Sequence, residues 1–358
     1  MTATGTTDRL AVAREAYASL GLYDPKRAPV DLDLTDNTNL WGVPPTAERT
    51  LRELAVSAMT RYPSLYAADL KGALADYVGV APEMVVTGCG SDDILDSAMR
   101  AFGEPGELVV SSDPSFAMIP IFAQMNALRW QGVVERADQQ PDVEALLALQ
   151  PKVLYLCTPN NPTGAVVPRA TIERVLTEST GVVMIDEAYA EFAGSSVIDL
   201  TARHDRLLVV RTLSKAFGLA GLRLGYAVGA PRLVAEVEKS RGPYKASAVA
   251  ERVGAVALRE DREWVEAHVA LAIEVRERLA SRLVTAGFRP LPSAANFVCV
   301  PVAQCVAVGQ AMRARGVAVR PFPALPHVGD TLRMSVGPWP LVERMLGVFL
   351  EANREVNG

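Results

Sequence analysis

Lys215 comes shortly after a stretch that is typical of a buried strand, Leu207 to Val210, with Thr212 and Ser214 in between. An amine where such a strand ends is partly desolvated. Desolvation disfavours the ammonium form, lowers the lysine pKa and leaves more free amine for nucleophilic attack. The two hydroxyls, and Arg223 eight residues after the lysine, suit a phosphate group. Together these groups predict a site for a carbonyl cofactor that carries a phosphate, and pyridoxal phosphate is the candidate.

Composition places the chain among folded, soluble proteins, because its 358 residues are 49% apolar and 22% charged. The net charge of −5 gives no general basis for binding nucleic acid. No stretch approaches the ~20 apolar residues that a membrane-spanning helix needs, and the first residues lack the basic start and apolar core of a secretion signal. We therefore expect a cytoplasmic protein with four free thiols. Three scattered histidines and no paired cysteine spacing predict no metal site.

The segment Ser214-Lys-Ala-Phe-Gly-Leu-Ala-Gly-Leu-Arg-Leu-Gly-Tyr226 is far more specific than a lone Ser-Lys pair. It resembles the active-site lysine segment of the fold-type I pyridoxal-phosphate aminotransferases, in particular of the histidinol-phosphate aminotransferase branch. Five further segments agree with that family in chain order. They are a phosphate cup, a stacking aromatic residue, Asn-Pro-Thr-Gly, Asp-x-x-Tyr and a C-terminal arginine strand. The resemblance covers nearly the whole chain.

The phosphate cup is the turn at Gly90, Ser91 and Asp92, before a predicted helix that runs toward Phe102 and is capped by Ser91 or Asp92. Glycines before a helix N-terminus expose N–H groups to an anion, and the helix dipole assists. Many strand-to-helix turns look alike, so the assignment of these three residues to the cofactor phosphate rests on the resemblance. Asp92 would contribute its backbone N–H and not its charge.

Asp186 ends a strongly apolar stretch, where a carboxylate is costly unless it is paired. A pyridinium nitrogen is a suitable partner, and an ionised carboxylate there would keep that nitrogen protonated and the ring a better electron sink. The resemblance implies that Asn161, in Asn-Pro-Thr-Gly, and Tyr189 hold the 3-oxygen of the ring. It also implies that Phe116 stacks on the ring face, although a phenylalanine is more often simply core.

Substrate contacts are expected from both ends of the chain. The amide-rich loop at 34–45 is by default a turn-forming loop, yet the family has a substrate-recognition loop there. Its usual Asn-Glu-Asn-Pro is not kept, since the chain has Asp-Asn-Thr-Asn at 36–39. A lone strand-end arginine usually forms a surface ion pair. The segment Leu332–Gly337, however, resembles the arginine strand that binds the substrate carboxylate, and a second arginine matches an anion-binding one. The resulting candidates are Tyr23, Asn37, Asn39, Asn296, Arg320 and Arg333.

Tyr62 precedes a proline, so its backbone is expected to be extended. A core tyrosine at a helix end is the ordinary interpretation. The resemblance implies instead that Tyr62 reaches across a dimer interface to the cofactor phosphate of the partner. A homodimer with shared active sites follows from that assignment.

The fold class that we expect is α/β, with the aminotransferase fold type I. A large domain with a mostly parallel seven-stranded sheet would carry the chemistry at its strand ends, beside a smaller α/β domain. We place an N-terminal arm at 1–34, packed with the small domain, the cofactor domain at 35–255 and the small domain at 256–358. The arm would hold a short helix from Arg9 to Leu20, and another helix would carry apolar positions from Leu51 to Ala58.

The resemblance implies transamination between an amine donor and a 2-oxo acid. Lys215 would hold the cofactor as a Schiff base and, once displaced, would move a proton between substrate and cofactor carbons. One hypothesis is that histidinol phosphate and 2-oxoglutarate give imidazole acetol phosphate and glutamate. A second is that the donor is an aromatic or other biosynthetic amino acid, which Phe116 and the unusual loop at 36–41 keep open. A third is decarboxylation of a phosphorylated amino acid on the same fold.

Overall fold

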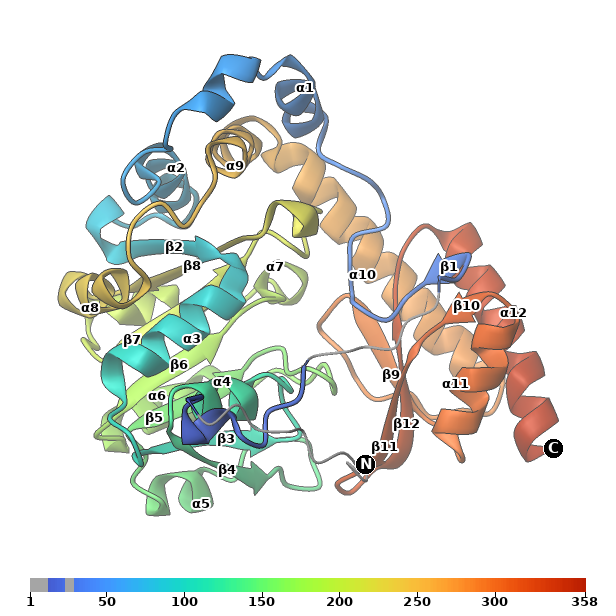
Figure 1. The fold of residues 1–358 in the computed structure, drawn as a ribbon. Helices are drawn as coiled ribbons and strands as arrows, with labels where there is room; N and C mark the ends of the chain where they lie inside the picture. The colour runs from blue at the N-terminus through green and yellow to red at the C-terminus, as the bar shows by residue number, and fades with distance from the viewer. Residues whose placement is uncertain (1–11, 23–28) are drawn as a thin grey trace.

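A seven-stranded sheet forms the centre of the larger part of the molecule in the computed structural model, which describes residues 12–22 and 29–358 apart from the side chains of residues 57 and 58 (Figure 1). Its strands are β2 (Val85–Cys89), β3 (Leu108–Asp113), β4 (Arg129–Val134), β5 (Val153–Cys157), β6 (Val182–Asp186), β7 (Leu207–Thr212) and β8 (Leu224–Gly229). Their spatial order is β2-β8-β7-β6-β5-β3-β4, and β8 alone runs antiparallel to its neighbours. The predicted mostly parallel, seven-stranded sheet is confirmed.

Burial follows the apolar sequence of the central strands. Every residue of β5, β6, β7 and β8 is buried, whereas the edge strand β4 is half-buried to exposed. Strands covered on both faces need apolar residues at every position, which is why these stretches do not alternate. Because β5, β6 and β7 are parallel neighbours, their carboxyl ends open together at one edge of the sheet.

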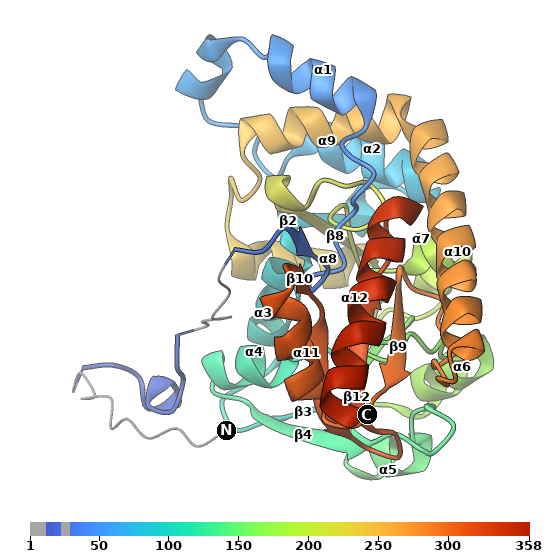
Figure 2. The ribbon, with the colours of Figure 1, turned by 90° about the vertical axis from the view of Figure 1, so that its right-hand side faces the viewer.

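Helices cover both faces of this sheet (Figures 1 and 2). One face packs against α3 (Gly90–Phe102), α4 (Ile119–Met125) and α8 (Pro231–Arg241). The other packs against α2 (Ala68–Val78), α5 (Val143–Ala148), α6 (Arg169–Glu178), α7 (Ala190–Ala193) and α9 (Ala248–Glu260), in a core that continues into the C-terminal part. Among the helices that the structure describes, none is both long and apolar enough to span a bilayer.

The C-terminal part is built on a three-stranded antiparallel sheet with the order β11-β12-β9. Its elements are β9 (Phe297–Pro301), α11 (Cys305–Ala314), β10 (Val317–Ala318), β11 (Arg320–Leu325), β12 (Gly329–Ser335) and α12 (Trp339–Asn357). The long helix α10 (Arg262–Thr285) runs from the larger part to this one, and α11 packs along α12 (Figures 1 and 2). Near the start of the chain, β1 (Leu32–Asp33) pairs in parallel with β10, so the chain leaves the smaller part to enter the larger one.

Two predicted helices differ from the structure. The helix expected from Arg9 to Leu20 lies partly outside the described residues, and within them the structure has only the 3-10 turn η1 (Glu15–Tyr17). The helix expected to continue to Ala58 ends early, because α1 spans Pro45–Glu53, Leu54 is extended and η2 (Val56–Thr60) follows. Leu51 is 48% exposed, so the expected apolar stripe has no core to pack into within one chain. The remaining 3-10 turns are η3 (Pro82–Met84), η4 (Ile198–Ala202) and η5 (Ala220–Leu222).

Candidate active site

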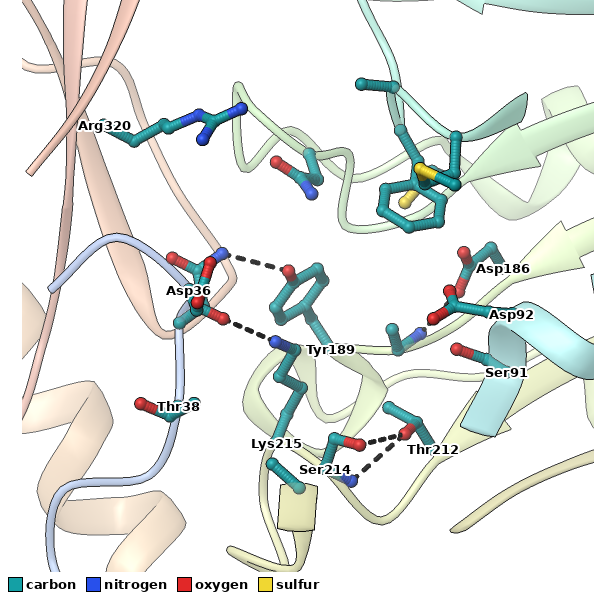
Figure 3. Close-up of a pocket in the computed structure, with 18 of the residues that line it drawn as sticks. Asp36, Thr38, Ser91, Asp92, Asp186, Tyr189, Thr212, Ser214, Lys215 and Arg320 are labelled. Atoms are coloured by element: carbon teal, nitrogen blue, oxygen red, sulfur yellow. Dashed lines mark hydrogen bonds between the residues drawn. The ribbon is translucent and has the colours of Figure 1, made fainter. Parts of the chain in front are cut away.

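A cavity of about 370 Å³ opens at the carboxyl ends of β5, β6 and β7 (Figure 3). The N-terminus of α3 closes one side, and β11, β12 and the segment 35–38 close another. The volume lies in the range of small-molecule sites. Most of the predicted site residues line it, namely Asn37, Ser91, Asp92, Phe116, Asn161, Asp186, Tyr189, Thr212, Ser214, Lys215, Arg223, Arg320 and Arg333. The fold thus brings together residues that are far apart in the sequence.

Lys215 lies just after β7, with its side chain directed into the cavity (Figure 3). Its Nζ donates a hydrogen bond of 2.6 Å to the backbone carbonyl of Asp36. Burial, followed by the positive charge of Arg333, lowers the lysine pKa to about 8, against the opposing charges of Asp36 and Asp92. A lowered pKa supplies neutral amine near neutral pH, which is what nucleophilic attack on an aldehyde needs.

Asp186 is the last residue of β6 and is only 4% exposed. One carboxylate oxygen accepts a hydrogen bond of 2.7 Å from the Tyr155 hydroxyl, and the other accepts one of 3.0 Å from the backbone N–H of Ala188. Burial raises its pKa to about 6, although both hydrogen bonds lower it, and the charges of Asp92 and Glu187 add to the increase. A buried carboxylate that stays ionised near neutral pH suits a cationic ring nitrogen.

The phosphate cup joins the turn before α3 to the end of β7. Gly90 has φ +81°, a conformation that favours glycine, and a Cβ there would lie 2.4 Å from the Arg223 guanidinium, which would have to shift. Arg223 forms an ion pair of 3.1 Å with Asp92, and the hydroxyls of Thr212 and Ser214 lie 2.9 Å apart. The predicted helix cap is wrong, because α3 begins at Gly90 and its cap position, Cys89, makes no side-chain cap. Asp92 therefore lies inside the first turn of α3, where its carboxylate holds Arg223.

Tyr189 and Asn161 line the cavity, and each accepts a hydrogen bond from another residue. The Tyr189 hydroxyl accepts a hydrogen bond of 3.0 Å from the Asn37 side chain (Figure 3), and the Asn161 side-chain oxygen accepts one from Arg333. Burial raises the pKa of Tyr189 to about 12, so the phenol keeps its proton as a donor. Phe116, between β3 and α4, lines the same cavity.

Arg320 and Arg333 come from neighbouring strands of the small sheet, where they are directly paired in register. Arg333 is 5% exposed, lies between the rings of Phe297 and Phe322 at 5.3 and 5.4 Å, and donates to the Thr35 carbonyl. Figure 3 shows Arg320 entering the cavity from the side opposite Asp186. Two guanidinium groups therefore face the cavity from its small-sheet side.

Five predicted residues are not among the cavity-lining residues, for different reasons. The Asn39 side chain donates to the Ala216 carbonyl at 3.1 Å, and Asn296 is buried behind the cavity, where it donates to the Asn37 carbonyl at 3.0 Å. Tyr62 is 83% exposed and packs against Tyr244, with 5.1 Å between ring centroids. Tyr23 lies outside the described residues. Gly90 is in the turn itself and contributes space.

Sequence reasoning missed several cavity residues, among them Thr35, Ser115, Met118, Cys157 and Phe322. It also missed Tyr155, which bonds Asp186 from behind. A signal was present for two of them, since Tyr155 and Cys157 alternate along β5 and so share one face of the sheet with Asp186. Among the described residues, no group of three or more His, Cys, Asp or Glu is arranged to hold a metal ion.

The residues present fit pyridoxal phosphate. Lys215 offers a neutral amine, and Asp186 offers a buried carboxylate. Because Gly90 has no Cβ, Arg223 and the N-terminus of α3 come together in the space beside it. When bound, that cofactor supplies the electron sink that acidifies the hydrogen on the amine-bearing carbon of a substrate.

Comparison with known proteins agrees with this geometry. A family model described as aminotransferase class I and II matches residues 29–348. The chain belongs to this family. It is 33% identical to a histidinol-phosphate aminotransferase of Thermoanaerobacter sp. (strain X514) over 91% of the chain and 94% of that relative. It is 38% identical to one of Methylibium petroleiphilum over 90% and 88% of the two chains.

The aminotransferase also matches solved structures. A crystal structure of histidinol-phosphate aminotransferase from Sinorhizobium meliloti, in complex with pyridoxal-5'-phosphate, has a TM-score of 0.85 at 24% identity and covers 98% of this chain and 99% of its own. The predicted family, the fold-type I architecture and the assignment as a pyridoxal-phosphate-dependent transaminase are thereby confirmed. As a member of this family, the enzyme uses an amine donor and a 2-oxo acid.

Proposed function

We propose that this aminotransferase transfers the amino group of histidinol phosphate to 2-oxoglutarate, giving imidazole acetol phosphate and glutamate. Relatives that are 32% to 38% identical over most of the chain are histidinol-phosphate aminotransferases. The observation that carries the proposal is the pair of arginines on the small sheet, Arg320 and Arg333, both facing the cavity. A guanidinium fork matches phosphate and carboxylate oxygens. The two arginines suit a phosphorylated donor and, in the other half-reaction, a dicarboxylic oxo acid.

We assign the proton transfer to Lys215. Its neutral amine can form the bond to the cofactor aldehyde, and after the donor amine displaces it, the same Nζ is positioned to move a proton. Nζ would take the proton from the amine-bearing carbon of the substrate and return it to the cofactor carbon on the other side of the amine nitrogen. The Asp36 carbonyl, which accepts from Nζ at 2.6 Å, would hold the freed amine inside the cavity between the two transfers.

The remaining residues would orient the ring. Asp186 would hold the ring nitrogen, and Asn161 and Tyr189 would donate to the 3-oxygen, since both face the same part of the cavity. Ser91, Thr212, Ser214 and Arg223 would hold the phosphate together with the N–H groups of Gly90 to Asp92. Phe116, an aromatic side chain without a polar group, would stack on the ring face.

The apolar part of the cavity lining favours a different amine donor, an aromatic amino acid. Phe116, Met118 and Phe322 all line it, and their side chains suit an aromatic ring as well as an imidazole. An aromatic amino acid would bring its carboxylate to Arg333 and would leave Arg320 with the oxo acid only. The two donors therefore differ in what Arg320 does.

A panel of donors with 2-oxoglutarate separates these functions. Glutamate formation is followed with histidinol phosphate, unphosphorylated histidinol, phenylalanine and a phosphorylated amino acid. Turnover with histidinol phosphate at a kcat/KM well above that of the others supports the proposal. Good turnover with phenylalanine and none with histidinol phosphate would replace it, and carbon dioxide release without glutamate would indicate a decarboxylase.

We also propose that the enzyme is a cytoplasmic homodimer divided at 1–34, 35–255 and 256–358. The four cysteines are free, which suits a reducing compartment. Exposed apolar side chains gather around α1 and η2, where Val56, Met59 and Tyr62 are each more than 60% exposed, and such a patch suits burial against a second copy. The pairing of β1 with β10 supports grouping the arm with the C-terminal part.

A further inference from the structure

Tyr155 lies in the middle of β5, fully buried, and its hydroxyl donates a hydrogen bond of 2.7 Å to Asp186. The register of β5 and β6 pairs Tyr155 with Met184 and Cys157 with Asp186. Tyr155 is therefore the diagonal neighbour of Asp186 on the same face of the sheet, a spacing that a long aromatic side chain can bridge. The hydroxyl reaches the carboxylate from within the core, because Tyr155 itself does not line the cavity whereas Asp186 does.

The groups around Asp186 act on its pKa in opposite directions. Those that interact with it electrostatically or by hydrogen bonds are Tyr155 and Cys157 on β5, Asp92 on α3, and Glu187, Ala188 and Tyr189 after β6. Burial, Asp92 and Glu187 favour the protonated form, although Glu187 is itself paired with Arg211 at 2.8 Å. The Tyr155 hydroxyl and the Ala188 N–H favour the ionised form, one on each carboxylate oxygen. Of these two donors, only the hydroxyl belongs to a side chain and can be removed by substitution.

We propose that Tyr155 is a positioning residue, whose hydroxyl keeps Asp186 ionised and fixes the rotation of its carboxylate toward the cavity. This inference rests on the proposed role of Asp186 opposite the ring nitrogen. With one oxygen bound by Tyr155 and the other by the Ala188 N–H, the carboxylate plane is held from two sides. Its remaining lone pairs are left for a cationic donor in the cavity. Loss of the hydroxyl removes a donor to a charged group in a dry environment, where such bonds have their largest effect.

The same sheet offers a matched control for the deletion of one hydroxyl. Tyr226 on β8 is buried like Tyr155, and its hydroxyl interacts with Arg211 and Glu191 rather than with Asp186. Tyr155→Phe and Tyr226→Phe therefore each remove one buried hydroxyl from the same sheet. Only the first deletion takes a hydrogen bond from Asp186.

The test uses the protein without cofactor, so that its result does not depend on turnover. Aspartate carrying ¹³C at Cγ is incorporated, Asp186 is assigned by comparison with Asp186→Asn, and its titration is followed by NMR. We expect Tyr155→Phe to raise the pKa of Asp186 from about 6 by roughly 1 to 2 units, the shift that corresponds to one hydrogen bond to a charged group. Tyr226→Phe should leave the titration of Asp186 as it is in the wild type. An unchanged midpoint in Tyr155→Phe overturns the proposal.

Two further measurements cover other outcomes. If Tyr155→Phe does not fold, the wild type still decides, because the ¹³Cζ signal of Tyr155 should shift with the same midpoint as the Cγ signal of Asp186; independent midpoints contradict the contact.

In the loaded enzyme, Tyr155→Phe should lower kcat near pH 7, and kcat should recover as the pH rises, with little change in KM for the donor. A purely structural role would lower activity equally at all pH values. Failure of histidinol phosphate as the donor would not affect the Asp186 titration, so the two proposals fail separately.

Discussion

The Lys215 amine lies among groups that act on its pKa in opposite directions. Burial, Arg333 and Arg223 lower the pKa, whereas Asp36 and Asp92 raise it, and the result is a pKa of about 8. Roughly a tenth of such an amine is neutral at pH 7, against well under a thousandth for an unperturbed lysine. Since the neutral amine is the nucleophile, burial accounts for most of the reactivity of this residue.

Removal of the amine should abolish covalent attachment of the cofactor. Borohydride fixes a lysine–aldehyde bond, so the treated wild-type protein should gain the mass of the cofactor, and Lys215→Ala should not. Lys239→Ala is the control, because that lysine is 70% exposed and, among the residues that the structure describes, pairs only with Glu236 on its own helix. A mass gain in Lys215→Ala after the same treatment would place the attachment at another lysine.

Arg320 should discriminate between a phosphorylated donor and its unphosphorylated analogue. Arg320→Ala is expected to raise KM for histidinol phosphate by about 10- to 100-fold, the range for a lost hydrogen bond to a charged group, and to leave KM for histidinol nearly unchanged. Arg320→Lys keeps the charge without the fork and should fall between the two. Equal losses with both donors would show that Arg320 does not bind the phosphate.

At this scale, the sequence predicts charged and hydroxyl-bearing side chains at strand ends well. Asp186 and Lys215 stand out because apolar strands precede them, and a charge there needs a reason. Tyr155 does not stand out, since a tyrosine inside an apolar strand has the pattern of core. Its hydroxyl matters because of the register between β5 and β6, which depends on contacts between distant segments.

The turn between β2 and α3 leaves space for Arg223 because Gly90 has no Cβ. Gly90→Ala should weaken binding of pyridoxal phosphate to the cofactor-free protein by at least about tenfold, because the added Cβ would lie 2.4 Å from the Arg223 guanidinium and displace it. Gly106→Ala is the matched control, since Gly106 has φ +86° but open space around the missing Cβ. Both variants place an alanine at positive φ, where an L-residue is strained. Equal binding by the two would mean that the space at Gly90 is not used by Arg223.

Glu135, just after β4, joins two loops behind the cavity. It is 4% exposed and accepts a hydrogen bond of 3.0 Å from Asn160, which in turn accepts one of 3.0 Å from Ser115. Burial, followed by the charges of Asp113 and Asp138, raises its pKa to about 8 from an ordinary 4.5. Between these pH values the folded state holds a proton that the unfolded chain has lost, so stability falls as the pH rises.

Glu135→Gln should remove that dependence. The difference in the free energy of unfolding between variant and wild type should change in favour of the variant as the pH rises from about 5 to about 8, by at most ~1.4 kcal/mol per pH unit. Urea unfolding at both pH values measures it, with the exposed Glu104→Gln as the control. A difference that does not vary with pH would contradict a protonated Glu135.

At the scale of elements, the sequence predicts strands better than helix ends. The apolar runs at β5 to β8 mark buried strands because both faces are covered. The start of α3 at Gly90 depends on backbone geometry. The early end of α1 depends on whether another part of the protein covers its apolar stripe. Asp261, far along the chain, accepts from the N–H groups of Thr46 and Ala47 at the start of α1, which no local pattern could reveal.

For the whole molecule, the proposed homodimer predicts that Tyr62, which is 83% exposed in one chain, lies against a second copy. In a mixture of Lys215→Ala and Tyr62→Ala chains, each mixed dimer would hold one site with both Lys215 and the partner's Tyr62 intact. If Tyr62→Ala is inactive, random exchange should restore about a quarter of the wild-type activity. Light scattering checks the dimer. No recovery on mixing, despite exchange of subunits, would contradict a shared site.

The chain between β1 and α1 crosses from the smaller part to the larger one past both ends of the cavity. Its main-chain oxygens hold two cavity residues. The Thr35 carbonyl accepts a hydrogen bond from Arg333, and the Asp36 carbonyl accepts one from Lys215. A peptide oxygen is the same whatever side chain it belongs to. The side chain at 38, which also lines the cavity, can thus vary in kind while the anchoring of the lysine and the arginine stays constant, which makes this short crossing a natural place to retune the choice of donor by protein engineering.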